Sequence, residues 1–392
     1  MSKLPSRRAA LGLGLGGCAL AGSGITAQLL GRAAGAKAQA SRVSGPLRIG
    51  YLPITDATAL VLAQAKGFYR EQGVQVGQAV MFRSWASLTE AFVSGTVDVI
   101  HLLMPMAIYL KYKLQVPAQI VAWNHVNGSA LTLAPHLKET SELAGKTLAI
   151  PAWFSVHNIL LQKLLRSAGL TPVIRRQPRA EQGETGLIVM SPSDMIPALA
   201  NATIAGFAVA DPFNAAAYLQ QVGRIHRFMG DIWRQHACCV TVIHSSLYES
   251  SPQTAQKLVN ALVQAQNYGR QNRVESAKIL ASNYLPQKES LILRALTDHG
   301  QDHPQALHHP SWRGQLLDFQ PYPYPSYTQE LVSSMQETLV DAPTGFLSQL
   351  DPGGVHADLV NQDLVKTALK NQGGLSIFGQ NSYLRREEIA AS

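Results

Sequence analysis

Cys238 and Cys239 are adjacent in the chain, and His236 lies two positions before them. Thiolates and imidazoles bind soft metal ions, and a thiolate is also a nucleophile and a redox group. A stable metal site needs three or four ligands, and the sequence shows no second cluster of ligating residues beside these three. Metal or redox chemistry by His236, Cys238 and Cys239 therefore stays an alternative, while no metal and no cofactor are expected.

The spacing of the two cysteines limits what they can form. A trans peptide bond holds neighbouring Cα atoms about 3.8 Å apart, closer than the roughly 4.4–6.8 Å of a relaxed disulfide. We therefore expect both thiols to be reduced or reversibly oxidised. Because the pair begins an apolar run, strand alternation predicts that one side chain faces the core and the other faces a cleft. Two small, buried apolar side chains are the alternative.

Other catalytic and nucleic-acid signals are missing from the sequence. There is no Gly-x-Ser-x-Gly elbow, His-Glu-x-x-His pair or phosphate-binding loop, so we do not expect an enzyme. The net charge of +8 falls to +3 when residues 1–40 are removed, because that segment holds five basic residues and no acid. No stripe of Lys and Arg with interleaved aromatic residues follows, which excludes nucleic acid as the expected partner.

From Leu47 onward, short apolar runs alternate with segments whose apolar residues repeat every three or four positions. This alternation of strands and helices predicts an α/β fold. Residues 299–330, rich in His, Pro and Tyr, are expected to form an ordered loop or strap. The expected strands cover 47–52, 74–76, 97–103, 119–123, 129–133, 147–150, 186–190, 206–209 and 238–243, and the expected helices cover 57–71, 86–94, 104–114, 156–167, 193–201, 214–221, 254–272, 274–283 and 288–298.

Several short motifs along residues 46–285 resemble the periplasmic solute-binding proteins of ATP-binding-cassette (ABC) importers for nitrate, bicarbonate and sulfonates. The resemblance implies a two-lobed periplasmic binding protein fold of type II, with the ligand in a cleft between two α/β lobes. It implies a first lobe of residues 46–130, a second of 131–243, a return to the first with C-terminal helices over 244–340, and a C-terminal extension over 341–392. Its carriers are Ile49-Gly50-Tyr51, Thr55-Asp56-Ala57, Lys66-Gly67-Phe68-Tyr69, Ser84-Trp85, Gly95-Thr96-Val97-Asp98, His101 to Pro105, Val126-Asn127-Gly128, Ala210-Asp211-Pro212-Phe213-Asn214 and Gly230-Asp231-Ile232-Trp233.

An open α/β sheet binds its ligand beyond the carboxyl ends of its strands, where these motifs lie. Trp85 also coincides with the tryptophan that contacts the ligand in the similar family. The expected ligand-binding residues are Thr55, Asp56, Trp85, Met104, Asn127, Ser129, Trp153, His157, Asp211, Asn214, His236 and Cys239.

Each of these residues also has an ordinary structural interpretation. Helix capping is the alternative for Asp56 and Asp211. Composition alone favours core packing for Trp85, a turn for Asn127 and a structural or surface role for His157.

The segment from Trp233 to Cys239 departs from the similar family. In the nitrate and bicarbonate binders it resembles tryptophan, two residues and then His-Pro-Glu-Lys, and Cys239 stands at the position of that lysine. Loss of a fixed positive charge argues against a small inorganic anion and for a neutral, larger or softer ligand. The cysteines also resemble, weakly, those of fungal pyrimidine-precursor synthases of thiamine biosynthesis, which leaves a related enzyme as the alternative.

The first residues predict export from the cytoplasm. Arg7 and Arg8 precede a modest apolar run, and Ala38-Gln39-Ala40 resembles a cleavage site, so we expect a twin-arginine signal peptide over residues 1–40. Lipidation of Cys18 is the alternative. The sequence thus predicts a periplasmic, monomeric solute-binding protein that captures a small polar or aromatic solute and delivers it to an inner-membrane ABC permease. A sensory binding protein stays open as well.

Overall fold

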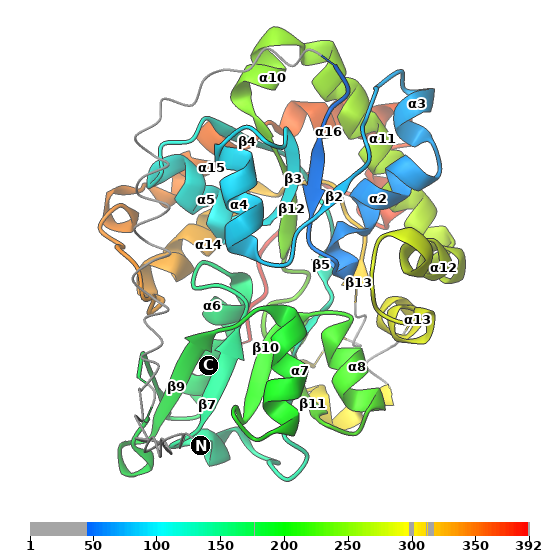
Figure 1. Cartoon of the computed structure of the whole chain (residues 1–392). Helices are drawn as coiled ribbons and strands as arrows, with labels where there is room; N and C mark the ends of the chain where they lie inside the picture. The colour runs from blue at the N-terminus through cyan, green and yellow to red at the C-terminus, as the bar shows by residue number, and fades with distance from the viewer. Residues whose placement is uncertain (1–44, 176, 298–301, 311, 313–316, 391–392) are drawn as a thin grey trace, which may run out of the picture.

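The computed structural model describes residues 45–175, 177–297, 302–310, 312 and 317–390 (Figure 1). The expected signal peptide and Cys18 lie outside the described residues. Within the described ranges, no helix combines the length and the apolar character needed to cross a membrane.

The upper sheet in Figure 1 has five strands in the order β2-β1-β3-β12-β4. Strand β1 runs parallel to β2 and β3, whereas β12 runs antiparallel to β3 and β4. The carboxyl ends of β1, β3 and β4 and the amino end of β12 therefore share one edge. The strands are β1 (Ile49–Tyr51), β2 (Val80–Met81), β3 (Val99–Leu103), β4 (Ala118–Trp123) and β12 (Cys239–His244).

The lower sheet has six strands in the order β11-β6-β10-β7-β9-β8. Strands β7, β8, β9 and β10 are parallel, and β6 runs antiparallel to β10 and β11. A short ladder of β5 (Val126–Asn127) and β13 (Leu317–Asp318) lies between the two sheets (Figure 1). The strands of the lower sheet are β6 (Ser129–Leu133), β7 (Thr147–Ile150), β8 (Thr171–Val173), β9 (Glu184–Val189), β10 (Gly206–Ala210) and β11 (Arg224–Phe228).

Helices cover both sheets, and most buried apolar side chains of the two sheets form one continuous core, beside a small separate core that includes Ile225 and Phe228 of β11. Local sequence starts several helices: the Ser84 and Ser155 hydroxyls accept from backbone N–H groups at the beginnings of α4 and α6. The α-helices are α2 (Thr58–Ala65), α3 (Phe68–Glu71), α4 (Trp85–Val93), α5 (Met104–Tyr112), α6 (Val156–Ser167), α7 (Pro192–Ala200), α8 (Phe213–Leu219), α9 (Met229–Ile232), α10 (Ser245–Ser250), α11 (Pro252–Gln271), α12 (Arg273–Asn283), α13 (Glu289–Thr297), α14 (Pro325–Glu337), α15 (Pro352–Leu359) and α16 (Gln362–Asn371). The 3-10 turns are η1 (Thr55–Ala57), η2 (Thr140–Leu143), η3 (Ala180–Gln182), η5 (Pro304–Ala306), η6 (Leu347–Gln349) and η7 (Leu375–Phe378).

The predicted alternation of strands and helices is confirmed, with several differences. Strands β8 and β11 were not predicted, and the helix expected over 57–71 is divided into η1, α2 and α3. The strand expected over 74–76 is wrong: Val76 makes only an isolated bridge to Leu47, and the edge strand is β2. Strand β12 lies in the first sheet, although the sequence placed it with the second set of elements. Helices α14, α15 and α16 were not predicted, and α14 begins at Pro325, within the segment 299–330 that was expected to be a loop or strap. The residue bounds of the two lobes stay a prediction.

Candidate functional site

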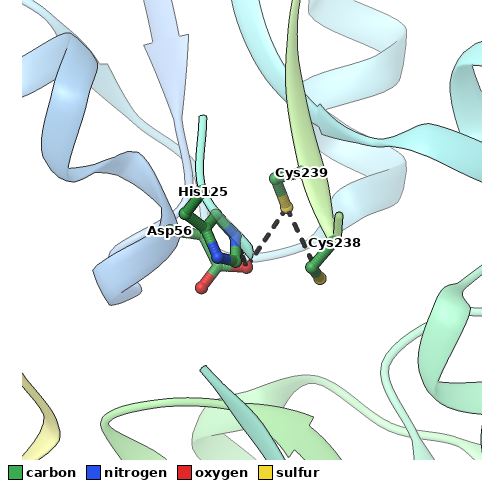
Figure 2. Close-up of side chains that lie close together, drawn as sticks. All are labelled: Asp56, His125, Cys238 and Cys239. Atoms are coloured by element: carbon green, nitrogen blue, oxygen red, sulfur yellow. Dashed lines mark hydrogen bonds and ion pairs between the residues drawn. The ribbon is translucent and has the colours of Figure 1, made fainter. Parts of the chain in front are cut away.

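Four buried side chains meet at the edge of the first sheet where β1, β3 and β4 end and β12 begins (Figure 2). Asp56 lies in η1, just after β1, and His125 follows β4. Cys239 is the first residue of β12, and Cys238 precedes it. One donor atom from each of these residues lies within 4.8 Å of the other three. Sheet topology therefore brings together residues far apart in the sequence.

Asp56 and His125 form an ion pair in the interior. His125 Nε2 lies 3.0 Å from Asp56 Oδ2, and both side chains are fully buried. Burial lowers the pKa of His125, but the Asp56 carboxylate and the neighbouring Cys238 together outweigh burial and raise that pKa to about 10. Burial raises the pKa of Asp56, and His125 reverses this effect and lowers it. Both groups are therefore charged at neutral pH, and their charges cancel.

The two thiols differ in acidity. Burial raises the pKa of both, but the S–H of Cys239 and the neighbouring His157 and His125 stabilise a thiolate at Cys238 and lower its pKa to about 5. Burial and that thiolate raise the pKa of Cys239 well above its usual value. Cys239 Sγ lies 3.9 Å from Cys238 Sγ and 3.3 Å from Asp56 Oδ2. Both cysteines are fully buried and free, and both sulfur atoms join the cluster.

The expectation that one cysteine faces the core and the other a cleft is therefore wrong. Alternation applies along a strand, and Cys238 lies outside β12.

Residues at the facing edge of the second sheet close over the cluster. His157, in α6, has its Nε2 3.9 Å from Cys238 Sγ and 3.0 Å from the Oγ of Ser129, at the start of β6. Thr55 donates its backbone N–H and its hydroxyl to the carbonyl oxygen of Asp211, which follows β10. The ligand-facing edges of the two sheets therefore touch through Thr55, Asp211, His157 and Cys238.

Two further histidines lie close to the ion pair and are neutral. Burial lowers the pKa of both His101 and His236 to about 3. His101 packs edge-on against Trp85, with ring centroids 5.3 Å apart. His236 Nδ1 lies 3.1 Å from the carbonyl oxygen of Trp233, and its Nε2 is buried without a hydrogen-bond partner. His236 is not one of the four clustered residues, and the histidine of the cluster is His125.

The remaining expected residues have varied surroundings. Met104 is fully buried, and its N–H donates to the carbonyl oxygen of Cys238. Asn127 is buried with φ of 58°, and both polar atoms of its side chain lack hydrogen-bond partners. Trp153 is half-buried at the turn before α6. Asn214 bonds within the second sheet: its amide donates to Val209 O and accepts from Thr132. Contact of each with a ligand stays a prediction.

His125 was missed from the sequence. It sits in a two-residue polar break, Asn124-His125, between an apolar strand and the Val126-Asn127-Gly128 motif. Hydrophobic periodicity identifies strands and helices, but it does not identify a single histidine after a strand as part of a site. The available signal was its position at the carboxyl end of β4, the edge where Asp56 also lies.

A surface hollow of about 640 Å³ lies elsewhere, beside Ala134–Leu137, Gly145–Thr147, Leu199–Ala205 and Gln221–Val222. Its residues precede β7 and β10 and follow the antiparallel β6, so it lies at the amino-terminal edge of the second sheet. Ligands of open α/β sheets bind at the opposite edge. The buried cluster is the stronger candidate because its chemistry and its position agree.

Residues 42–282 match the model of the NMT1-like family, which is more than half of the chain. The chain belongs to the NMT1-like family. Among relatives, it is 26% identical to the nitrate/nitrite binding protein NrtA of Nostoc sp. over 255 residues, which cover 59% of this chain and 56% of that protein. It is 28% identical to the nitrate import ATP-binding protein NrtC of Synechocystis over 261 residues, which cover 62% of this chain and 37% of that protein.

Solved structures of similar shape confirm a two-lobed periplasmic binding protein fold of type II for this NMT1-like chain. The periplasmic nitrate-binding protein NrtA from Synechocystis PCC 6803 matches with a TM-score of 0.72 at 19% identity, covering 88% of this chain and 93% of that one. The ligand-binding component of an ABC-type import system from Staphylococcus aureus, solved with zinc bound, matches with a TM-score of 0.66 at 21% identity, covering 83% and 99%. The chain spans 56% of the length of the Nostoc NrtA protein and 37% of the length of the Synechocystis NrtC protein.

Proposed function

We propose that this protein is the extracytoplasmic solute-binding component of an ABC importer. It captures a small polar or aromatic solute between the facing edges of its two sheets and delivers it to a membrane permease. The observation that carries the proposal is that polar groups at the ligand-binding edges of both sheets converge on one buried cluster. Membership of the NMT1-like family and the similarity to the nitrate/nitrite binding protein NrtA support the same function.

The charges at the cluster favour a neutral solute over nitrate. Asp56 and His125 compensate each other, and the lowered pKa values of His101 and His236 leave those rings uncharged at neutral pH. The lowered pKa of Cys238 adds a thiolate, whose negative charge opposes an anion. Cys239 replaces the lysine that we infer from the resemblance to nitrate binders. A neutral polar or aromatic molecule, such as a substituted pyrimidine, would find hydrogen-bonding groups and the Trp85 ring there.

Solute capture would work through closure. A solute that contacts residues of both sheets binds the closed arrangement better than the open one, and so shifts the population toward closure. Thr55 connects the two edges in this structure by two hydrogen bonds to the carbonyl oxygen of Asp211. We further propose a periplasmic monomer, exported by the twin-arginine route, with an ABC permease as partner.

Calorimetric titration of the chain from Ser41 onward tests this function. We expect a hydroxymethylpyrimidine or another neutral aromatic solute to bind, and nitrate, bicarbonate and an alkanesulfonate not to. Native mass spectrometry of the purified protein adds a search for a solute carried through purification. Tight nitrate binding would contradict the proposal. So would the failure of both experiments, with no solute bound in the titration and none carried through purification.

A matched pair of tryptophan variants locates the solute. Trp85 and Trp312 are equally buried, but Trp312 belongs to a small separate core with Phe228 and Ile225. We expect Trp85→Phe to weaken solute binding by roughly ten-fold, because losing one buried hydrogen bond or ring contact lowers affinity by about this factor. Trp312→Phe should leave the affinity unchanged.

The lowered pKa of Cys238 favours one second candidate, an enzyme or redox protein. Replacing both cysteines with serine separates the two functions. Turnover of a pyrimidine precursor that is abolished in this variant would support the enzyme, whereas solute binding that survives without turnover would support the receptor.

A further inference from the structure

The four clustered side chains combine donors that transition metals prefer. Cys238 and Cys239 each offer a sulfur, His125 an imidazole nitrogen and Asp56 a carboxylate oxygen. Two sulfurs, one nitrogen and one oxygen suit a borderline ion such as Zn²⁺, whereas Mg²⁺ and Ca²⁺ prefer oxygen ligands alone. Figure 2 shows the four side chains close together, with Cys239 linked to both Asp56 and Cys238. They come from η1, the segment after β4 and the start of β12.

The distances between donor atoms are close to the edges of a tetrahedron around zinc. Bond lengths of about 2.3 Å to sulfur and about 2.0 Å to nitrogen or oxygen give edges of roughly 3.8 Å between sulfurs and roughly 3.3–3.5 Å for the mixed pairs. The two sulfurs are 3.9 Å apart, Cys239 Sγ is 3.3 Å from Asp56 Oδ2, and His125 Nε2 is 3.0 Å from Asp56 Oδ2. The other three donor–donor distances are at most 4.8 Å, so side-chain adjustment would complete the coordination.

Buried polar atoms in the cluster are left without hydrogen bonds. Asp56 Oδ1 and both ring nitrogens of His125 lack a hydrogen-bond partner, and the contact between His125 and Asp56 is an ion pair without hydrogen-bond geometry. Both residues are at most 1% exposed. Unpaired polar atoms in the interior are costly and are rare in native proteins, so the unpaired atoms of Asp56 and His125 favour a ligand at the cluster.

We propose that Asp56, His125, Cys238 and Cys239 bind one zinc-like divalent transition metal ion in tetrahedral geometry. Binding forms four coordinate bonds and involves no electron transfer. The Cys238 thiolate binds as it stands, and the protons of the Cys239 thiol and of the His125 nitrogen that binds the ion leave to solvent. His157, from the second sheet, stays outside the coordination sphere and positions Cys238 through its 3.9 Å contact with Sγ. The proposal rests on the cluster itself and holds whichever solute the protein carries.

The first experiment uses the mature chain, purified with reduced thiols and without chelators. Elemental analysis should find zinc at one ion per chain, and a chromophoric chelator should compete for it only slowly. Replacement by Co²⁺ should give the intense visible bands of tetrahedral cobalt together with thiolate-to-cobalt charge transfer. This spectrum reports thiolate coordination in the unaltered protein. The proposal would be overturned if a folded chain with two titratable thiols bound neither Zn²⁺ nor Co²⁺. It would also be overturned if the bound Co²⁺ were octahedral and showed no thiolate charge transfer.

Variants then test the identity of the ligands. We expect His125→Gln and Cys239→Ser to weaken zinc affinity by roughly 100-fold or more, since each removes a direct ligand. His236→Gln is the matched control, because His236 is equally buried beside the cluster but is not one of the four donors. It should retain both the zinc and the cobalt spectrum. Equal loss in all three variants, each shown to be folded by circular dichroism, or retention in the two ligand variants, would refute this set of ligands.

Metal and solute are separable outcomes. Solute binding without any metal would leave the importer function standing and remove the metal site. Zinc binding without any solute would support the metal site and contradict the importer function.

Discussion

Thr55 donates two hydrogen bonds to one acceptor, the carbonyl oxygen of Asp211: its backbone N–H at 3.0 Å and its hydroxyl at 2.8 Å. Thr55 follows the first strand of one sheet, and Asp211 follows β10 of the other. This is a direct connection between the two edges that we propose to enclose the solute. Its strength therefore contributes to the balance between open and closed arrangements.

Thr55→Val removes the hydroxyl and keeps both the shape of the side chain and the backbone hydrogen bond. We expect the closed arrangement to lose about 1 kcal/mol relative to the open one, the usual net worth of one hydrogen bond. Small-angle X-ray scattering should then show a larger radius of gyration without solute. Thr58→Val is the control, because the Thr58 hydroxyl bonds only within its own turn, to Thr55 O. An equal change in both variants would contradict the role of Thr55.

His226 should make the protein sensitive to acid. Burial first, and then the nearby positive charges of Arg224, Arg227 and His308, lower its pKa to about 4 in the folded chain, with Glu142 opposing. Its pKa in the unfolded chain is about 6.5, so the unfolded state binds more protons between these two values and stability falls as the pH drops.

The measurement is urea unfolding at pH 7 and pH 5. His226→Gln cannot take up the proton and should lose less stability over this range, by on the order of 1–2 kcal/mol. His136→Gln, at an exposed histidine, should follow the unaltered protein. The same loss in His226→Gln as in the unaltered protein would contradict the prediction.

Arg385 holds the C-terminal segment against the aromatic rings of Tyr324 and Trp123. Its guanidinium makes two hydrogen bonds to Glu387 and lies over the rings of Tyr324 and Trp123, 4.6 and 5.0 Å from their centroids. We expect Arg385→Met to lower the free energy of unfolding by roughly 2 kcal/mol, because Glu387 then stays half-buried without this cation. Chemical denaturation measures the loss. Arg386→Met, at the exposed neighbouring residue, should change stability by less than about 0.5 kcal/mol.

Gly206 allows β10 to approach β6 closely. A Cβ at this position would lie 2.6 Å from the carbonyl oxygen of Thr132 and 2.5 Å from Leu133 Cδ2. Because a backbone oxygen cannot move aside as a side chain can, Gly206→Ala should destabilise the protein by about 1–3 kcal/mol. Thermal unfolding measures this. Gly345→Ala, where no atom lies within 4 Å of the new Cβ, should have little effect. A stable Gly206→Ala protein would mean that β10 shifts freely.

Part of the site was predictable because it depends on local order. Asp56 and Cys239 each lie at a strand end that hydrophobic periodicity marks, and His157 begins a helix after a strand. His125 has no such local marker, and its importance depends on the three-dimensional arrangement of β4 beside β12. His236 was expected beside the cysteines because it is near in sequence, but its ring turns toward the carbonyl oxygen of Trp233.

The sequence by itself determined the α/β alternation, the helices expected over 86–94 and 156–167 and the unusual pair of thiols, since these follow from periodicity and residue type within short segments. Only the tertiary structure decided that β12 returns antiparallel between β3 and β4. That return places Cys238 and Cys239 beside Asp56 and His125. The pairing of strands distant in the chain depends on burial summed over the whole core, and no local pattern of residues records that sum.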